Sequence, residues 1–342
     1  MQGAGRIVVC FAVIALGCGT DDKPAETPAV HEAKTGDPKR PARPTAQTYH
    51  VEWQRCAAYF NARDERKLAE CFPSGSELVI AGHQPITGSG ILELHKQLWT
   101  GFANYSLDSQ ASWVSGNTAA ILAIVGGTQT GEYQGAPATG KTARQLALYV
   151  LDLGNDWRIK RATLYTDEAL AARQLGRLPA TVPVRPPADS PFAFRDNIAS
   201  AGDDVESAAA AHVASYEAAL NARDMAALAA LFSDDATLYH PSLSGAVQGR
   251  DQVQKTYETL LARVSNAKQT TTRTLSAGGW VIVEHTFAGT MSGVALTVPA
   301  ATLFHVENGR IRGVWLFENT MPALEKIAAA TTATTGSPQP SP

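Results

Sequence analysis

The chain has 342 residues, enough for two domains of ordinary size, and 44% of them are hydrophobic, as in a globular protein. Lys and Arg number 29 against 32 Asp and Glu, so the net charge of −3 predicts no basic stripe, and no nucleic acid is expected as a partner. No apolar run reaches the roughly 18–20 residues that a membrane-spanning helix needs. The composition therefore excludes a transmembrane protein.

Residues 1–18 have the pattern of an export signal. Arg6 and the terminal amine precede an apolar stretch at residues 7–16. The stretch ends in Ala15-Leu16-Gly17-Cys18, which is similar to the lipobox of bacterial lipoproteins, whose cysteine receives diacylglycerol. We expect an exported protein attached by lipid at Cys18 to the cell envelope, and Gly19 favours the outer membrane. An ordinary cleaved signal peptide is the alternative.

Proline marks the segments that are expected to lack structure. Residues 19–46 carry five prolines among small and charged residues and form a predicted disordered tether. Residues 177–205 carry five more and are predicted to be a linker, and the Ala, Thr, Ser and Pro of residues 328–342 predict a disordered tail. Two compact segments remain, 47–176 and 206–327, and each is predicted to be a domain.

The two predicted domains repeat each other. Asn61-Ala62-Arg63-Asp64 recurs as Asn221-Ala222-Arg223-Asp224. Three further pairs of similar blocks follow in the same order: 127–131 and 289–293, 158–159 and 310–311, and 164–165 and 316–317. Ordered blocks across a whole domain indicate two diverged copies of one fold.

The elements of the second copy can be predicted in chain order. A helix comes first, because Val213, Tyr216 and Leu220 share one helical face. The sequence then predicts a helix at 225–232 with Asp224 as its N-cap, an acidic turn at 234–235, a strand from 236, a helix at 252–264, and strands at 280–290, 296–306 and 311–318 with an Asn-Gly hairpin turn at 308–309. Helices followed by an antiparallel meander predict an α+β fold in which a curved sheet wraps a long helix.

This order, with these residues, resembles the nuclear transport factor 2-like cone, and within it the SnoaL-like polyketide cyclases and the ketosteroid isomerases. In the first copy, residues 127–141 resemble the SnoaL pattern G-T-H-x-G-E-aromatic followed by G-x-P-x-T-G-K, and residues 167–179 resemble that family's ending. In the second copy, residues 216–241 are closer to the isomerase pattern. The resemblance implies two tandem cone-shaped α+β barrel domains with apolar pockets.

Neither a nucleotide nor a metal nor any other cofactor is expected. Residues 135–142 satisfy the P-loop expression G-x4-G-K-[ST], but a P-loop needs a helix after it to cradle phosphates, and residues 145–153 are predicted to be a strand. The histidines show no spacing typical of a metal site.

In the first copy, the resemblance assigns a catalytic position to Asp167. The family's base, which removes a proton next to a carbonyl, falls on Asp167, and the family's histidine position holds Gln129. The counterpart of Asp167 in the second copy is Asn319, which cannot act as a base. An N-cap for a helix at 168–175 is the alternative role of Asp167. Tyr149 is expected to line the pocket.

In the second copy, the resemblance points to Tyr216 and His240. Tyr216 matches the isomerase phenol that stabilises an enolate oxygen, and the proton-shuttling carboxylate falls on His240, which can transfer a proton near neutral pH. Thr302 takes the place of the second acidic donor, and Trp315 is also expected to line the pocket. The alternative is that Tyr216 is a core aromatic and His240 a strand-end histidine.

Cys56 and Cys71 both fall in the first copy, on consecutive predicted helices. An oxidising compartment permits a disulfide between them. Two buried free thiols are the alternative.

The sequence as a whole favours a lipid-anchored envelope protein that binds a small apolar or amphipathic ligand. A cyclase or isomerase using Asp167, or Tyr216 with His240, is the first alternative, and a non-catalytic interaction module is the second. Because cones of this type often dimerise through an apolar sheet face, the two copies are expected to pack as an internal pseudo-dimer.

Overall fold

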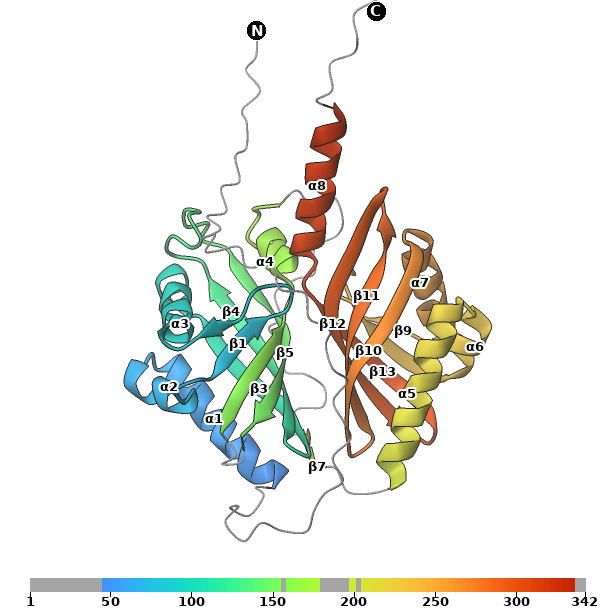
Figure 1. The fold of residues 1–342 in the computed structure, drawn as a ribbon, viewed down its shortest axis with the longest axis horizontal. Coiled ribbons are helices and arrows are strands. Elements are labelled where there is room, and N and C mark those ends of the chain that lie inside the picture. The colour runs from blue at the N-terminus through green and yellow to red at the C-terminus, as the bar shows by residue number, and fades with distance from the viewer. Residues whose placement is uncertain (1–44, 155–157, 179–196, 201–203, 336–342) are drawn as a thin grey trace, which may run out of the picture.

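The computed structural model describes residues 45–154, 158–178, 197–200 and 204–335, which form two α+β domains with curved sheets (Figure 1). The predicted fold class is therefore confirmed. The predicted signal segment with Cys18 lies outside the described residues, as do nearly all of the tether and most of the linker.

The first domain contains a seven-stranded sheet within the described residues, in the order β2-β1-β6-β5-β4-β3-β7. All neighbouring strands are antiparallel except the pairs β1–β6 and β3–β7. Its elements are α1 (Ala46–Asn61), α2 (Glu65–Cys71), β1 (Glu77–Ile80), β2 (Ile86–Thr87), α3 (Ser89–Gly101), β3 (Ser106–Ser115), β4 (Thr118–Thr128), β5 (Thr142–Leu153), β6 (Ile159–Tyr165), α4 (Glu168–Gln174) and β7 (Asn197–Ser200).

The second domain repeats this plan with a six-stranded sheet, again counted in the described residues, in the order β10-β11-β12-β13-β8-β9. Only β13 and β8 run parallel. Its elements are α5 (Asp204–Ala222), α6 (Met225–Ala230), β8 (Phe232–Tyr239), β9 (Val247–Gln248), α7 (Arg250–Ala262), β10 (Ser265–Ala277), β11 (Trp280–Met291), β12 (Val294–Glu307), β13 (Arg310–Glu318) and α8 (Met321–Thr335).

The repeated Asn-Ala-Arg-Asp block makes the same hydrogen bonds in both copies. The Asn61 side chain bonds the backbone N–H and C=O of Leu107, both at 2.9 Å, and Asn221 bonds those of Gln269 at 2.7 and 2.8 Å. Each asparagine thereby ties the end of its long helix to the first strand of the meander. The repeated asparagine therefore has a structural role, because its side-chain amide is hydrogen-bonded to the backbone in both domains.

The Arg and Asp of the block also act on the backbone. Arg63 and Arg223 have φ of 57° and 56°, and both donate to main-chain carbonyls near the end of the third helix of their domain. Asp64 and Asp224 cap the following helix by accepting a hydrogen bond from the N–H three residues on, at 3.1 and 2.9 Å.

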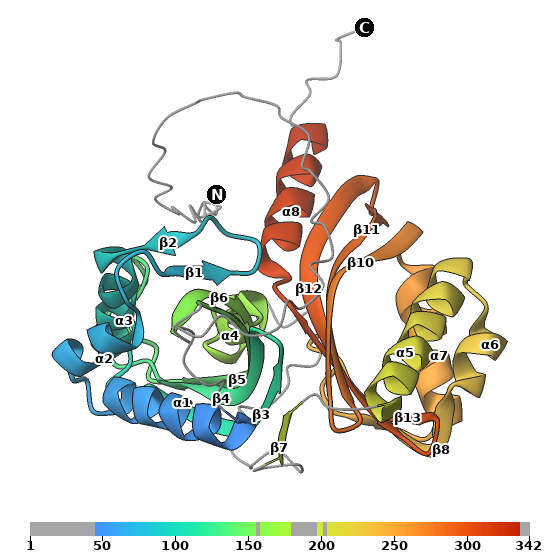
Figure 2. The same ribbon diagram turned by 60° about the horizontal axis from the view of Figure 1, so that its bottom comes forward.

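The two sheets face each other in the middle of the molecule, with α1–α3 and α5–α7 on the outer sides (Figures 1 and 2). A cluster of buried apolar residues joins them, and Trp113 of β3 packs against Trp280 of β11 with ring centroids 5.2 Å apart. Both tryptophans are at most 1% exposed. The cluster therefore buries the outer face of each sheet against the other domain.

A polar network crosses the same interface. The hydroxyl of Tyr165 donates to Glu284 at 2.7 Å, and Arg273 bridges Glu284 and Asp152. The guanidinium supplies a charged partner for each carboxylate, and the buried Glu284 also receives the phenol. Both of its carboxylate oxygens are therefore hydrogen-bonded.

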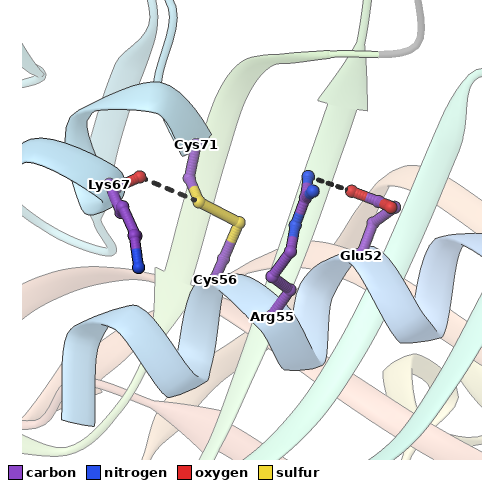
Figure 3. The surroundings of a disulfide bond; sticks show 5 residues. All are labelled: Glu52, Arg55, Cys56, Lys67 and Cys71. Carbon is purple, nitrogen blue, oxygen red and sulfur yellow. Dashed lines mark hydrogen bonds and ion pairs between the residues drawn. A yellow bond between two sulfur atoms is a disulfide. The ribbon is translucent and has the colours of Figure 1, made fainter. Parts of the chain in front are cut away.

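A disulfide joins α1 to α2. Cys56 and Cys71 have Cα atoms 6.0 Å apart, and Figure 3 shows the bridge between the two helices, with the Arg55–Glu52 ion pair beside it on α1. Of the two alternatives that the sequence left open, the structure contains the disulfide.

The chain departs from the predicted elements in several places. The predicted acidic turn at 234–235 lies inside β8, and β10 was not predicted, because its polar residues hide its alternation. Residues 197–200 of the predicted linker form β7, which pairs with β3. The predicted tail from residue 328 is wrong as far as Thr335, because α8 continues through alanines of high helix propensity.

Candidate functional site

Asp167 lies at the junction between the domains. Its Oδ1 accepts hydrogen bonds from Ala169 N at 3.1 Å, Thr320 N at 3.0 Å and Thr320 Oγ1 at 2.8 Å. The residue is 2% exposed, and burial raises the pKa of its carboxyl against the opposing effect of these bonds. Asp167 therefore occupies the N-cap position of α4 and also holds the start of α8. The alternative helix-capping role is the one that the geometry supports.

Asn319 performs the equivalent task from the other domain. Its Oδ1 accepts from Met321 N and from Glu168 N, both at 3.3 Å. Its amide nitrogen donates to Glu168 Oε2 at 2.8 Å and to the carbonyl of Ala81 at 3.3 Å. The segments that follow β6 and β13 thus each carry a residue that bonds to the start of its own domain's terminal helix and to the start of the other domain's. We call this arrangement the reciprocal cap (Asp167, Glu168, Asn319 and Thr320).

Gln129 organises a loop. Its fully buried amide donates to the carbonyls of Gly131 and Pro137, both at 3.0 Å, and accepts from Thr139 Oγ1 at the same distance. The P-loop-like string lies in this loop and runs directly into strand β5 at Thr142, so the helix that a phosphate site needs does not follow it.

The first cone is packed with aromatic rings. Tyr149 lies on its inner wall, with its ring centroid 5.2 Å from that of Trp53 of α1. Phe60 contacts Trp99 in the same core. The position that Tyr216 occupies in the second copy is Cys56 here, and it is committed to the disulfide. The first cone therefore lacks the phenol of the isomerase-like pattern.

Tyr216 is buried in the core of the second cone. Its hydroxyl donates to that of Tyr257 at 2.8 Å, and its ring packs against Phe304 with centroids 4.9 Å apart. Burial raises the pKa of this phenol. Tyr216 thus takes the core position that the sequence left as the alternative, with its hydroxyl already satisfied.

Polar side chains cross the inner face of the second sheet in one row. In the strand register, Ala300 of β12 pairs with Glu318 of β13 on one side and with His285 of β11 on the other. Directly paired residues point to the same face, so the two polar side chains flank the small Ala300. Thr302 lies one step along on the same face, and His240 follows the neighbouring strand β8. We call His240, Glu318, His285 and Thr302 the polar row.

His240 and Glu318 form the titratable pair of the row. Nε2 of His240 is 3.5 Å from Glu318 Oε1, and the two side chains are only 11% and 15% exposed. The N–H of Ser242 donates to His240 Nδ1 at 3.2 Å, so in the neutral ring the proton lies on Nε2, facing the carboxyl. Burial, together with the charge of Asp167, raises the pKa of Glu318 to about 7.

His285 and Thr302 form the other half of the row. His285 Nε2 lies 2.9 Å from Thr302 Oγ1, and burial lowers the pKa of this histidine to about 4. Its Nδ1 is buried and has no hydrogen-bond partner in the part of the chain that the structure describes. An unsatisfied buried nitrogen is costly, so it would gain from a ligand atom.

An apolar rim adjoins the polar row. On the same face of β11 and β12, beyond the polar row, Phe287 pairs with Val298, and Gly289 pairs with Leu296. The side chains of Phe287, Val298 and Leu296 are half-buried, unlike the deeper residues of the cone. The inner face therefore changes from a packed base, through the polar row, to a partly exposed apolar rim.

A hollow of about 210 Å³ lies between the loop after β8 and helix α7. Ser242 forms part of its wall, and the Ser242 hydroxyl is 2.7 Å from His240 Nδ1. The other lining residues come from the same loop and from α7: Leu243, Lys255, Thr256, Thr259, Leu260 and Arg263.

One expectation about the site is corrected, and two residues of the site were not predicted. Trp315, predicted to line a pocket, points away from the cone into the interdomain cluster, with its ring centroid 5.8 Å from that of Trp280. Glu318 and His285 were missed as site residues. The alternation of side chains along the strand could have revealed Glu318, because it places residue 318 on the same face as residues 314 and 316.

Within the described residues, no group of three or more His, Cys, Asp or Glu side chains could hold a metal ion. None of the described helices is long and apolar enough to cross a membrane.

Comparison with known proteins supports the SnoaL-like, nuclear transport factor 2-like fold. Residues 213–314 match the family model described as the SnoaL-like domain. A search of curated proteins finds no match.

Several solved structures are similar to one domain of this chain. One is a hypothetical protein with a ketosteroid isomerase-like fold from Catenulispora acidiphila, in complex with trimethylamine, with 24% identity and a TM-score of 0.33, covering 34% of this chain and 92% of that chain. An LEH-like epoxide hydrolase from M. tuberculosis has 17% identity and a TM-score of 0.34, and the match covers 39% of this chain and 98% of that chain. A SnoaL-like polyketide cyclase from Jannaschia sp. has 18% identity and a TM-score of 0.36, and the match covers 38% of this chain and 97% of that chain.

Proposed function

We propose that the second cone binds a small amphipathic ligand and that the protein is held at the bacterial cell envelope by a lipid at Cys18. The observation that carries the proposal is the polar row beside a half-exposed apolar rim on one continuous inner face. Ligand pockets combine a mostly apolar lining with a few polar groups that fix orientation. The ligand's apolar body would lie against the rim and its polar group against the row.

The chemistry of the row favours a neutral polar group. His285 is uncharged near neutral pH and offers an unpartnered Nδ1, which suits a hydroxyl or a carbonyl. Glu318, with a pKa of about 7, is partly ionised at neutral pH and would repel an anionic ligand group. We therefore expect alcohols or ketones to bind better than carboxylates.

The location of the protein at the envelope is supported by two independent features. The Ala15-Leu16-Gly17-Cys18 string follows an apolar signal stretch, as in lipoproteins, where the cysteine carries the lipid. The disulfide between Cys56 and Cys71 is of the kind that persists in an oxidising compartment. Gly19 favours the outer membrane.

The binding proposal is tested with the full chain. Native mass spectrometry of protein purified from its own envelope should reveal a co-purifying small molecule. Isothermal titration calorimetry should show decanol binding about tenfold more tightly than decanoate, a difference of about 1.4 kcal/mol. Phe287→Ala should weaken decanol binding several-fold, whereas Val125→Ala, at the matching position of the first cone, should leave it unchanged.

Absence of any co-purifying molecule, together with no binding of decanol, decanoate or a neutral steroid, would overturn the proposal. The interaction module and the proton-transfer function below would then remain.

Proton transfer is a second candidate function, favoured by the His240–Glu318 pair. A carboxyl with a pKa of about 7, 3.5 Å from an imidazole, can exchange a proton near neutral pH. The test incubates the protein with a cyclic ketone in D2O. If the protein removes a proton next to the carbonyl, deuterium enters the α-carbon of the ketone, and NMR measures the rate of this exchange. Glu318→Gln should abolish the incorporation, and wild-type protein without activity above the buffer rate would reject this function.

A further inference from the structure

The residue that the SnoaL-like pattern makes catalytic is used here to hold the other domain. Asp167 Oδ1 binds Thr320 through both its N–H and its hydroxyl, at 3.0 and 2.8 Å, while its bond to Ala169 caps the first domain's own helix α4. Asp167 therefore restrains the backbone that immediately follows strand β13.

The same short segment is held a second time, one residue earlier. Asn319 donates to Glu168 Oε2 at 2.8 Å and to the Ala81 carbonyl at 3.3 Å, and accepts from Glu168 N at 3.3 Å. Residues 319 and 320 are thus held by three residues of the first domain: the residue after β1, the N-cap residue of α4 and the first residue of α4.

Glu318 of the polar row directly precedes this restrained segment. Its backbone is in register with Ala300, which fixes one side, and the reciprocal cap fixes the residues that follow. The 3.5 Å separation between His240 and Glu318 is thus set on a strand whose end is held by first-domain residues.

We infer that the first domain positions the site of the second, with Asp167 as the positioning residue that acts on Glu318 through Thr320. This inference rests on the proposed function of the second cone. It gives the first domain a role that requires no ligand of its own. The charge of Asp167, which helps to raise the pKa of Glu318, is a second route by which the same residue acts.

The experiment separates geometry from charge by using two substitutions in the full chain. Asp167→Ala removes the acceptor, whereas Asp167→Asn keeps an amide oxygen that can accept from Thr320. The matched control is Asp224→Ala, which removes a helix cap of the same kind, bonded to Ala227 N at 2.9 Å, with no part in the reciprocal cap. Asp224→Ala therefore shows what the loss of one helix cap does by itself, with no change at the junction between the domains.

Two readouts are compared at pH 9, where Glu318 is ionised in every variant. In 15N-labelled protein, the ring resonances of His240 should shift in Asp167→Ala and stay near their wild-type positions in Asp167→Asn and in Asp224→Ala. Decanol affinity should fall about tenfold in Asp167→Ala alone, as expected when a binding residue is displaced. If Asp167→Ala does not fold, Thr320→Val, which removes one of the two donors, takes its place.

Wild-type resonances and affinity in a folded Asp167→Ala or Thr320→Val variant would overturn the inference, as would equal shifts in Asp224→Ala. Failure of the wild type to bind decanol would count against the proposed function, whereas the His240 resonances decide the positioning role without any ligand.

Discussion

Replacing Glu318 by Gln should stabilise the protein at alkaline pH. The ordinary pKa of a Glu carboxyl is 4.5, and burial raises that of Glu318 to about 7 in the folded protein. The folded state therefore binds more protons than the unfolded state between these values, so the contribution of Glu318 to stability is full below pH 4.5 and is lost as the pH rises through 7.

The magnitude follows from the two pKa values. Their difference of 2.5, multiplied by 1.36 kcal/mol for each pH unit, gives about 3 kcal/mol. Glutamine has nearly the same shape and no charge, so Glu318→Gln should gain about 3 kcal/mol relative to wild type between pH 4 and pH 8. Comparing the two proteins at each pH cancels the titration of the groups that do not interact with Glu318.

The assay is urea unfolding followed by circular dichroism at pH 4, 6 and 8. The same substitution in a His240→Gln background shows how far the imidazole offsets the free-energy cost of burying the charged Glu318 carboxylate. The reasoning is refuted if the difference in free energy of unfolding between Glu318→Gln and wild type stays constant across this range. It is also refuted if wild type gains stability relative to Glu318→Gln as the pH rises. Either result would mean that the carboxylate is solvated or paired well enough to stay ionised at no cost.

Three further outcomes are expected, each measured by urea unfolding. Replacing Cys56 and Cys71 together by Ser should lower the free energy of unfolding by about 3 kcal/mol, because the bridge closes a loop of 15 residues; an unchanged midpoint would contradict this. Asn221→Ala should destabilise by about 1–3 kcal/mol while decanol affinity stays at the wild-type value, and a selective loss of affinity would show that the repeated block serves binding. Trp280→Ala should destabilise by about 3–5 kcal/mol, since the ring is buried between the domains; a loss under 1 kcal/mol would mean that the interface contributes little.

The fold was largely readable from the sequence because its signals are local. Asp224 caps α6 as predicted, and Asn308 and Gly309 both have positive φ, as a two-residue hairpin turn requires. Strand β10 was missed, since its partly exposed face carries Thr, Arg and Lys, which obscure the alternation that marks a strand.

The candidate site was harder to predict, because its residues meet through strand register. Glu318 and His285 are brought to either side of Ala300 only once three strands have paired. Asp167 shows the opposite difficulty: its motif was recognised, but its bonds to Thr320, 153 residues away, decide what it does. A motif alone does not reveal such a partner.

The reciprocal cap has a consequence for how such a molecule can diverge. Two identical chains paired in this way would carry the same residue on both sides of the two-fold axis, so any change would alter both sites at once. Fusion of the two copies into one chain removes that constraint. Asp167 and Asn319 occupy equivalent places and differ, so an ionisable carboxyl stands on one side of the junction and a neutral amide on the other. One half of a fused pair can thus specialise as a scaffold while the other keeps, or acquires, its own chemistry.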